Sequence, residues 1–205
     1  MMESYSQACQ DVFVCKTLKE KHNGFFLEIG SNHPIHSNNS YLLETKYNWK
    51  GIMVEYDQSF APEYKVHRPH SIHVLDDARN VHYRQLLDDN HFPTNMDYLQ
   101  VDLDVDNKST LDTLMILDST VFDTYKFATI TFEHDIYTGD YFDTRNISRQ
   151  IFKDRGYILV FPDVTVYGDK PFEDWYVHPE LVDMEYIQRI KTDVSLTCEE
   201  IRKLL

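Results

Sequence analysis

The chain has 205 residues and a formal net charge of −14, and 42% of its residues are hydrophobic. This length and apolar content suit one compact domain with its own core, spanning residues 1–205. Nucleic-acid binding requires clustered Lys and Arg to replace phosphate counterions, so the acidic balance argues against a nucleic-acid partner.

No apolar run is long enough to span a bilayer, and residues 1–10 lack the basic start and apolar middle of a signal peptide. The three cysteines, Cys9, Cys15 and Cys198, are odd in number and lack metal-type spacing. We therefore expect free thiols in a reducing compartment, and a cytoplasmic protein that binds no membrane.

Apolar periodicity and turn residues place the expected elements along the chain. An opening helix is expected over residues 6–22 and a final helical segment over 179–205, which packs on the sheet or in a homodimer. Strands are expected at 25–29, 51–54, 71–75, 96–101, 128–132 and 157–161, helices at 38–47 (capped by Ser37 or Asn38), 81–89, 109–117 and 147–155, and an antiparallel edge pairing at 165–167. This alternation predicts an α/β fold with a mostly parallel, doubly wound sheet.

Residues 24–57 form the most informative segment, a βαβ unit with a ligand site at its carboxyl edge. The first strand stops at Gly30-Ser31-Asn32, a small-residue turn that lets a ligand lie against the backbone. The second strand delivers Glu55, an acidic residue placed to accept hydrogen bonds from a ribose diol. The turn has one glycine where a dinucleotide fingerprint needs three, so a nucleoside without phosphates is the better prediction.

This segment resembles the FkbM-type class I S-adenosylmethionine-dependent methyltransferases. The matching residues are Glu28-Ile29-Gly30-Ser31-Asn32, Ser37-Asn38, Leu43-Glu44, Trp49-Lys50-Gly51-Ile52 before Glu55, Asp77-Ala78, Tyr83-Arg84, residues 96–104 and residues 171–176. The resemblance covers most of the chain. Departures from the family pattern are His33-Pro34 and Asp102-Leu103-Asp104, where many members carry Asp-x-Glu-Gly.

The resemblance implies a Rossmann-like class I methyltransferase fold with S-adenosylmethionine as the cofactor. In the family pattern, Glu28 and the Gly30 turn lie beside the methionine part of the cofactor, and Glu55 binds the ribose hydroxyls. Asp77 with Ala78 meets the adenine. The further cofactor contacts implied are Ser31, Asn32, Asn38, Tyr56 and Asp102.

Acidic residues recur where the predicted strands end, at Glu28, Glu55, Asp77, Asp102 with Asp104, and Glu133 with Asp135. Any one of them alone could simply cap a helix or face water, but recurrence at one sheet edge favours a site. Hard oxygen ligands converging from adjacent strand ends are what Mg²⁺ or Mn²⁺ requires.

The two later acidic clusters are similar to the site of the metal-dependent sugar O-methyltransferases of the macrocin type. This resemblance implies Asp102 and Asp135 as metal ligands, Glu133 or His134 as a third ligand, and Asp104 as general base. A sugar hydroxyl has a very high pKa, so methyl transfer to it needs Lewis-acid coordination, a positioned base, or both.

Several features have a second interpretation. One acidic cluster could instead cap a helix or pair with Arg145 or Arg149. His36, like His33, lies near the expected methyl donor and is a candidate catalytic base or substrate contact, although a loop histidine is more often neither. The aromatic residues within 172–176 could form a sugar-stacking wall or part of the core.

The sequence therefore predicts an S-adenosylmethionine-dependent O-methyltransferase acting on a sugar hydroxyl of a glycan or glycoside. The alternatives are a non-catalytic S-adenosylmethionine-binding module and a methyltransferase for a non-sugar small molecule. A nicotinamide oxidoreductase is disfavoured by the single glycine in the first turn. A compact enzyme of this kind also resembles the glycan-modifying methyltransferases of large DNA viruses, which implies the host cytoplasm as its compartment.

Overall fold

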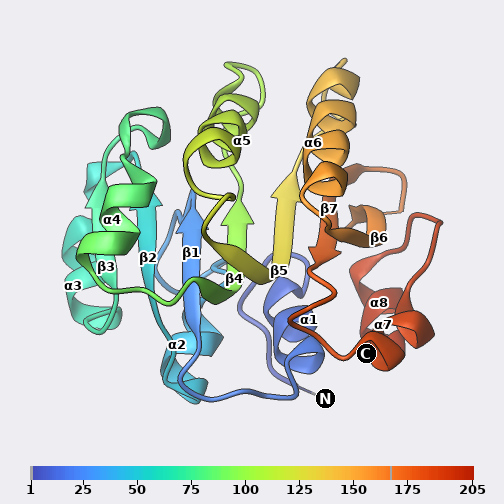
Figure 1. The fold of residues 1–205 in the computed structure, drawn as a ribbon, viewed down its shortest axis with the longest axis horizontal. Helices are drawn as coiled ribbons and strands as arrows, with labels where there is room; N and C mark the ends of the chain where they lie inside the picture. The colour runs from blue at the N-terminus through green and yellow to red at the C-terminus, as the bar shows by residue number, and fades with distance from the viewer. Residues whose placement is uncertain (1, 167) are drawn as a thin grey trace.

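The computed structural model describes residues 2–166 and 168–205, which form an α/β fold around one seven-stranded sheet. The strands are β1 (Phe25–Ile29), β2 (Lys50–Glu55), β3 (Ile72–Leu75), β4 (Asn95–Val101), β5 (Lys126–Glu133), β6 (Ile158–Thr165) and β7 (Pro171–Val177). Their order is β3-β2-β1-β4-β5-β7-β6, and β7 runs antiparallel to both of its neighbours (Figure 1). The predicted fold class is confirmed, with β7 inserted between β5 and the outermost strand β6.

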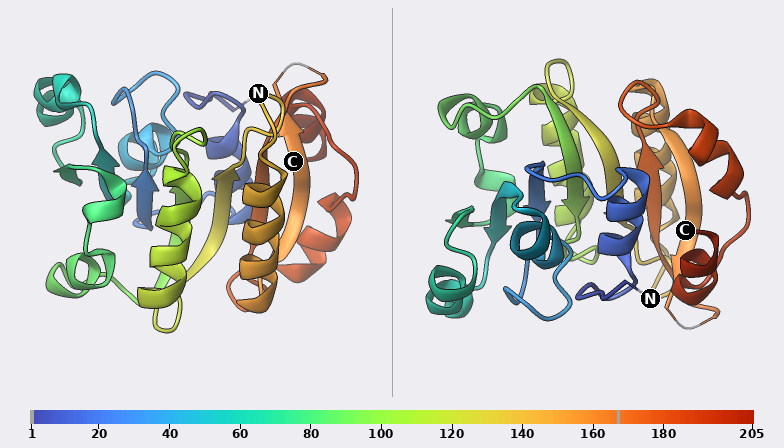
Figure 2. Two further views of the ribbon diagram at one scale, coloured as in Figure 1. Left: turned by 90° about the horizontal axis from the view of Figure 1, so that it is seen from above. Right: turned by 90° about the horizontal axis from the view of Figure 1, so that it is seen from below.

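Helices cover both faces of the sheet (Figure 2). One face carries α1 (Gln10–Thr17), α2 (Tyr41–Tyr47), α3 (Ala61–His67), α7 (Met184–Ile190) and α8 (Cys198–Leu204), and the other carries α4 (Tyr83–Asp89), α5 (Ser109–Thr120) and α6 (Phe142–Asp154). Short 3₁₀ helices, η1 (Gln58–Phe60) and η2 (Ala78–Asn80), follow β2 and β3. Because each face packs against its own apolar cluster, the central strands are buried on both sides. Within the described ranges, no helix has the length and apolar character that crossing a membrane requires.

The first helix begins later than the predicted residue 6 and ends at Thr17 instead of residue 22, shortly before Lys19 and Glu20, which have positive φ. It begins late because the residues before it fold back onto its first turn. The carboxylate of Asp11 is fully buried and accepts hydrogen bonds from the hydroxyls of Ser4 (2.6 Å) and Ser6 (2.5 Å). It also accepts one from the backbone N–H of Tyr5 (2.7 Å). Side-chain hydrogen bonds of this kind compete with helix formation, so α1 begins only at Gln10.

The antiparallel strand near the sheet edge is β7, and not residues 165–167 as predicted. Thr165 is the last residue of β6, and Tyr167 lies outside the described residues. In β7, Phe172, Trp175 and Tyr176 are 5%, 0% and 2% exposed, so these aromatic side chains belong to the core and form no sugar-stacking wall. The predicted antiparallel strand at 165–167 is therefore wrong, because β7, beginning at Pro171, is the strand that pairs antiparallel with β6.

Glu173 of β7 provides a test of this core. It is 1% exposed, and its carboxylate accepts hydrogen bonds from the side chains of Gln10 (3.0 Å) and Trp175 (2.6 Å). Burial raises the pKa of Glu173 from 4.5 to about 8. Glu173 therefore contributes its full stabilisation below the unfolded-state pKa of 4.5, and this stabilisation is lost as the pH rises through the folded-state pKa of about 8.

We expect the free energy of unfolding to fall by about 1.4 kcal/mol per pH unit across this window on account of Glu173. Glu173→Gln keeps an acceptor oxygen for both donors and carries no charge, so it should flatten this dependence. Urea unfolding of both proteins at several pH values between those two pKa values measures the difference. Parallel pH profiles for the two proteins would contradict the assignment.

Candidate functional site

A cleft of about 1000 Å³ opens at the carboxyl ends of the parallel strands. Its lining includes the last residues of β2 (Glu55) and β5 (Glu133) and residues just after β1 (Gly30), β3 (Asp77) and β4 (Asp102). The strand order reverses beside β1, since β2 and β3 continue on one side of it and β4 and β5 on the other. Open α/β sheets bind their ligands at such a switch point.

Most of the predicted site residues meet in this cleft. The predicted residues that line it are Gly30, Asn32, His36, Glu55, Tyr56, Asp77, Ala78, Asp102, Asp104 and Glu133. Sequence reasoning assigned no site role to six further lining residues, Gln7, Ser37, Arg79, Leu103, Asn107 and Ser109. Gln7 comes from the segment before α1, and only the folded chain brings it to the strand ends.

The floor of the cleft depends on Gly30, which has a φ of +83°. A Cβ atom at this position would lie 1.6 Å from the carbonyl oxygen of Asp102, far inside van der Waals contact. The backbone N–H groups of Gly30 and Ser31 both donate to the carbonyl of Val54, at 2.9 and 3.1 Å. The turn after β1 is therefore fixed against both neighbouring strands, and only glycine fits there.

Glu55 is held at the end of β2 by the backbone. Its two carboxylate oxygens accept hydrogen bonds from the N–H of Asn32 (2.6 Å) and the N–H of Asp57 (2.8 Å). These bonds join the turn after β1 to the end of β2 and fix the carboxylate at the cleft. Each oxygen keeps a second lone-pair direction, so the group can also accept from a ligand diol.

Asp77 and Ala78 lie further along the same side of the cleft. The guanidinium of Arg79 binds the Asp77 carboxylate at 2.6 and 3.0 Å, and the backbone N–H of Arg79 adds a bond of 2.9 Å. These hydrogen bonds lower the pKa of Asp77 to about 2, so the carboxylate stays charged near neutral pH. Ala78 is 4% exposed, and its carbonyl accepts a hydrogen bond from Tyr83.

Carboxyl groups dominate the other side of the cleft. Burial raises the pKa of Asp102, and burial with the nearby charge of Asp102 raises the pKa of Glu133 well above its usual value. Burial also raises the pKa of Asp135, which lies near Glu133 but does not line the cleft. Asp104 is exposed, and its oxygens accept from the N–H of Asp106 (3.0 Å) and the amide of Asn107 (3.2 Å). This side can hold a cation or accept a proton.

His134 does not join these carboxylates, although the sequence places it between two of them. The side chain is fully buried, is not among the lining residues, and has its Nε2 atom 3.4 Å from Asp163 and 3.5 Å from Asp174. Successive side chains near a strand end point to opposite faces, which separates His134 from Glu133. Its placement does not support a catalytic role in the cleft.

The only trio of described metal-ligand side chains with donor atoms within 4.8 Å of one another is His134, Asp163 and Asp174. Arg149 binds Asp174 through two hydrogen bonds of 2.7 Å, and Arg145 lies 3.1 Å from Asp163. Two guanidinium groups already balance the two carboxylates, so we interpret this trio as a buried ion-pair cluster. These arginines thus pair with Asp163 and Asp174 instead of the predicted acidic clusters.

The carboxylate oxygens of the predicted metal trio, Asp102, Glu133 and Asp135, do not all lie within 4.8 Å of one another. Asp135 is also not among the lining residues. Asp102 and Glu133 both line the cleft. Their oxygen donors suit a hard divalent ion in chemical type.

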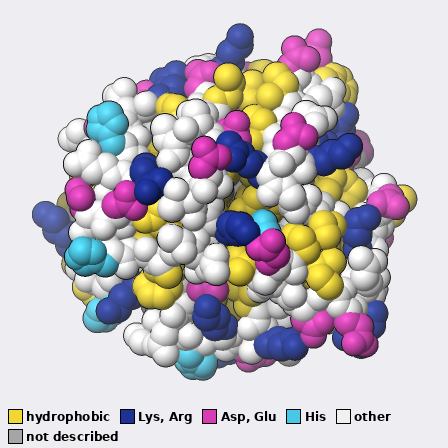
Figure 3. All heavy atoms as spheres, viewed as in Figure 1, with side chains coloured by type: hydrophobic (Ala, Val, Ile, Leu, Met, Phe, Trp, Pro, Cys, Tyr) yellow, Lys and Arg dark blue, Asp and Glu magenta, His cyan; other side chains and the backbone are white. Residues whose placement is uncertain are grey.

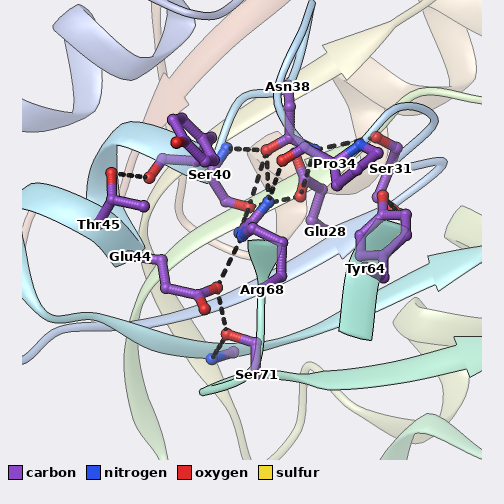
Figure 4. Close-up of polar contacts among 12 residues, drawn as sticks. Glu28, Ser31, Pro34, Asn38, Ser40, Glu44, Thr45, Tyr64, Arg68 and Ser71 are labelled. Carbon is purple, nitrogen blue, oxygen red and sulfur yellow. Dashed lines mark hydrogen bonds and ion pairs between the residues drawn. The ribbon is translucent and has the colours of Figure 1, made fainter. Parts of the chain in front are cut away.

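Glu28 lies beneath the cleft and does not line it. Its fully buried carboxylate accepts from the N–H of Asn39 (3.0 Å), the hydroxyl of Ser40 (2.5 Å) and the amide of Asn38 (3.4 Å) (Figure 4). Burial raises the pKa of Glu28 to about 7. Ser31, also buried and absent from the lining, and Asn38 belong to the same underlying layer, so the predicted direct contacts of these three residues with a cofactor are not supported by their placement.

The start of α2 also differs from the prediction. Ser40, and not Ser37 or Asn38, occupies the N-cap position, and its side chain makes no capping hydrogen bond. Its hydroxyl binds Glu28 instead.

No protein-family model and no curated protein sequence matches this chain. Solved structures with a similar fold include a TehB-like SAM-dependent methyltransferase from Corynebacterium glutamicum (TM-score 0.54, 12% identity, 82% of this chain and 87% of that one). TrmK of M. capricolum, solved with S-adenosylhomocysteine, has a TM-score of 0.53 and 14% identity over 89% of this chain and 72% of that one. A precorrin-6y C5,15-methyltransferase from Geobacter metallireducens has a TM-score of 0.52 and 14% identity over 82% and 86%.

These likenesses establish the fold, which is the Rossmann-like fold of class I methyltransferases. The FkbM and macrocin-type resemblances, the viral relationship, the cytoplasmic location and the homodimer remain predictions.

Gly30→Ala tests the floor of the cleft, and Gly156→Ala is a matched control. Both glycines have a φ of +83°, but a Cβ at Gly156 would meet only one atom, at 3.9 Å. Both variants should lose about 1–2 kcal/mol of unfolding free energy through the backbone conformation. Gly30→Ala should lose a further ~1–3 kcal/mol through the clash with Asp102. Urea unfolding measures both losses, and equal losses would show that the turn can relax away from Asp102.

Proposed function

We propose that the protein is an S-adenosylmethionine-dependent O-methyltransferase that acts on a sugar hydroxyl of a glycan or glycoside. The observation that carries this proposal is the cleft at the switch point, where Glu55 is fixed by two backbone N–H groups beside the Gly30 turn. A carboxylate held in this way suits the ribose diol of the donor. The shared fold with named methyltransferases, one of them solved with S-adenosylhomocysteine, supports the same donor.

The charge of the cleft supports a neutral acceptor. Asp102, Asp104 and Glu133 line one side of it, and the only Lys or Arg among the described lining residues is Arg79, which is bound to Asp77. An anionic acceptor such as a phosphorylated sugar or a nucleic acid would meet this acidic wall. On the face formed by α4, α5 and α6, Lys and Arg side chains are scattered among acidic and apolar ones (Figure 3).

Methyl transfer from a sulfonium is an in-line displacement at carbon, so the protein must align the donor and the acceptor hydroxyl and accept a proton. Asp104 is the general base of the proposal, because its carboxylate lines the cleft and is held by Asp106 and Asn107. His36 also lines the cleft and is the alternative proton acceptor from the loop after β1.

We extend the proposal to a divalent ion, Mg²⁺ or Mn²⁺, held by Asp102, Glu133 and Asp135. Burial raises the pKa of all three carboxyl groups, so a cation that neutralises them would be favoured there. Such an ion would supply Lewis-acid activation of the acceptor hydroxyl. Binding requires the three carboxylates to approach one another more closely than they do in this structure.

Calorimetric titration with S-adenosylhomocysteine tests the donor site. We expect the wild-type protein to bind and Glu55→Ala to bind on the order of tenfold more weakly or not at all, because one diol acceptor is lost. Glu180→Ala is the matched control, because Glu180 is exposed, pairs with Lys126 and does not line the cleft. Failure of the wild-type protein to bind would refute the methyltransferase proposal.

Binding of S-adenosylhomocysteine without methyl transfer to any member of a panel of neutral glycosides would favour the non-catalytic binding module or a non-sugar acceptor. Turnover is followed as S-adenosylhomocysteine released from S-adenosylmethionine.

The metal is tested by titrating Mn²⁺ into the wild-type protein and into Asp102→Asn. We expect measurable binding in the wild type and a loss of about tenfold or more in the variant, because a carboxylate ligand is replaced by a neutral amide. Asp154→Asn, at the exposed end of α6, is the control. Identical heats for wild type and Asp102→Asn, together with turnover that chelation leaves unchanged, would remove the metal from the proposal.

A further inference from the structure

Helix α3 reaches the loop between β1 and α2 through two buried side chains, Tyr64 and Arg68 (Figure 4). We call residues 31–40 the donor loop, because Asn32, His36 and Ser37 within it line the cleft. Tyr64 lies within α3, and Arg68, four positions later, is the C-cap residue directly after it, so both side chains lie on one side of the helix. Tyr64 and Arg68 are 1% and 2% exposed and are absent from the cleft lining.

Arg68 holds the far half of the donor loop. Its guanidinium donates to the carbonyl of Pro34 (3.1 Å), the side-chain oxygen of Asn38 (2.8 Å) and the hydroxyl of Ser40 (2.6 Å). A further hydrogen bond of 2.8 Å runs to Glu44 in α2. The planar fork of an arginine can serve several acceptors at once, which a lysine cannot do with the same geometry.

Tyr64 holds the near half of the loop. Its hydroxyl lies 2.7 Å from the hydroxyl of Ser31 and 2.7 Å from the carbonyl of Asn32. The Tyr64 ring stacks on His73 of β3 with a centroid separation of 3.7 Å. The hydroxyl is thus anchored to the sheet and meets the loop at the residue whose N–H binds Glu55.

The buried network continues from the loop to β1. Ser40 joins Arg68 to Glu28, and Asn38 contacts both Arg68 and Glu28. The two α3 side chains therefore fix the loop from its first residues to its last ones, on the side away from the cleft. A loop fixed before binding loses less conformational entropy when a ligand arrives.

We propose that Tyr64 and Arg68 are positioning residues for the methyl donor and form a clamp that sets the donor loop, and through Asn32 also Glu55, in the binding conformation. This inference rests on the proposed function, because it assigns the clamp to donor binding. The clamp acts through the loop and touches no ligand.

Tyr64→Phe removes one hydroxyl and keeps the stacked ring, so it tests the clamp with little change in packing. We expect the dissociation constant for S-adenosylhomocysteine, measured by calorimetry, to rise about tenfold. Tyr125→Phe is the control, because Tyr125 is 3% exposed and donates its hydroxyl to Asp88 at 2.6 Å, away from the cleft. Arg68→Lys should weaken binding as well, and Tyr64→Phe keeps the test valid if that variant does not fold.

Amide hydrogen exchange of the ligand-free proteins separates positioning from general stability. In Tyr64→Phe, exchange should speed up in peptides covering residues 31–40 and stay unchanged in β4. If the wild-type protein and Tyr64→Phe bind S-adenosylhomocysteine equally well, the inference is overturned, whatever the hydrogen exchange shows. If the wild-type protein does not bind, the proposed function fails, and the exchange pattern alone decides whether the clamp orders the loop.

Discussion

The contact between Gly30 and the carbonyl of Asp102 is the constraint on which the rest of the site depends. At this point the ends of β1 and β4 approach so closely that no side chain fits between them. The turn is then directed toward β2, where Gly30 and Ser31 donate to Val54 and Asn32 donates to Glu55. The close approach of Gly30 to the Asp102 carbonyl thus shapes the floor of the cleft and fixes the position of the Glu55 carboxylate at its edge.

Beneath this floor lies a polar layer that is unusual for a protein core. Arg68, Glu28 and Glu44 are all nearly or fully buried, and isolated buried charges are strongly unfavourable. Glu28 accepts hydrogen bonds from the loop, Arg68 donates to the loop and to Glu44, and Glu44 also accepts from Ser71, which offsets part of the desolvation. Because these partners fit only one conformation of the loop, the network favours that conformation over alternatives.

The two halves of the cleft differ in how their charges are balanced. Asp77 is neutralised by Arg79 and Glu55 is held by backbone donors, so the first half is ready for a neutral polar ligand. In the second half, Asp102 and Glu133 have raised pKa values because burial and nearby carboxylates disfavour their charged forms. Arg145 and Arg149, which could have relieved them, are bound to Asp163 and Asp174.

The sequence by itself determined the parallel α/β sheet and the gathering of acidic residues at its carboxyl edge. Alternating or continuous apolar residues are a local signal for a strand, and the strand at 25–29 is found where it was predicted. The carboxyl ends of neighbouring parallel strands lie at the same edge of the sheet, which brings their acidic residues together. Only the tertiary structure decided which of these side chains reach the cleft. Glu28 is buried by Asn38, Asn39 and Ser40, and α3, which the pattern did not predict, supplies the clamp through contacts with a loop about thirty residues earlier. These outcomes depend on packing between distant segments, and local periodicity carries no information about such packing.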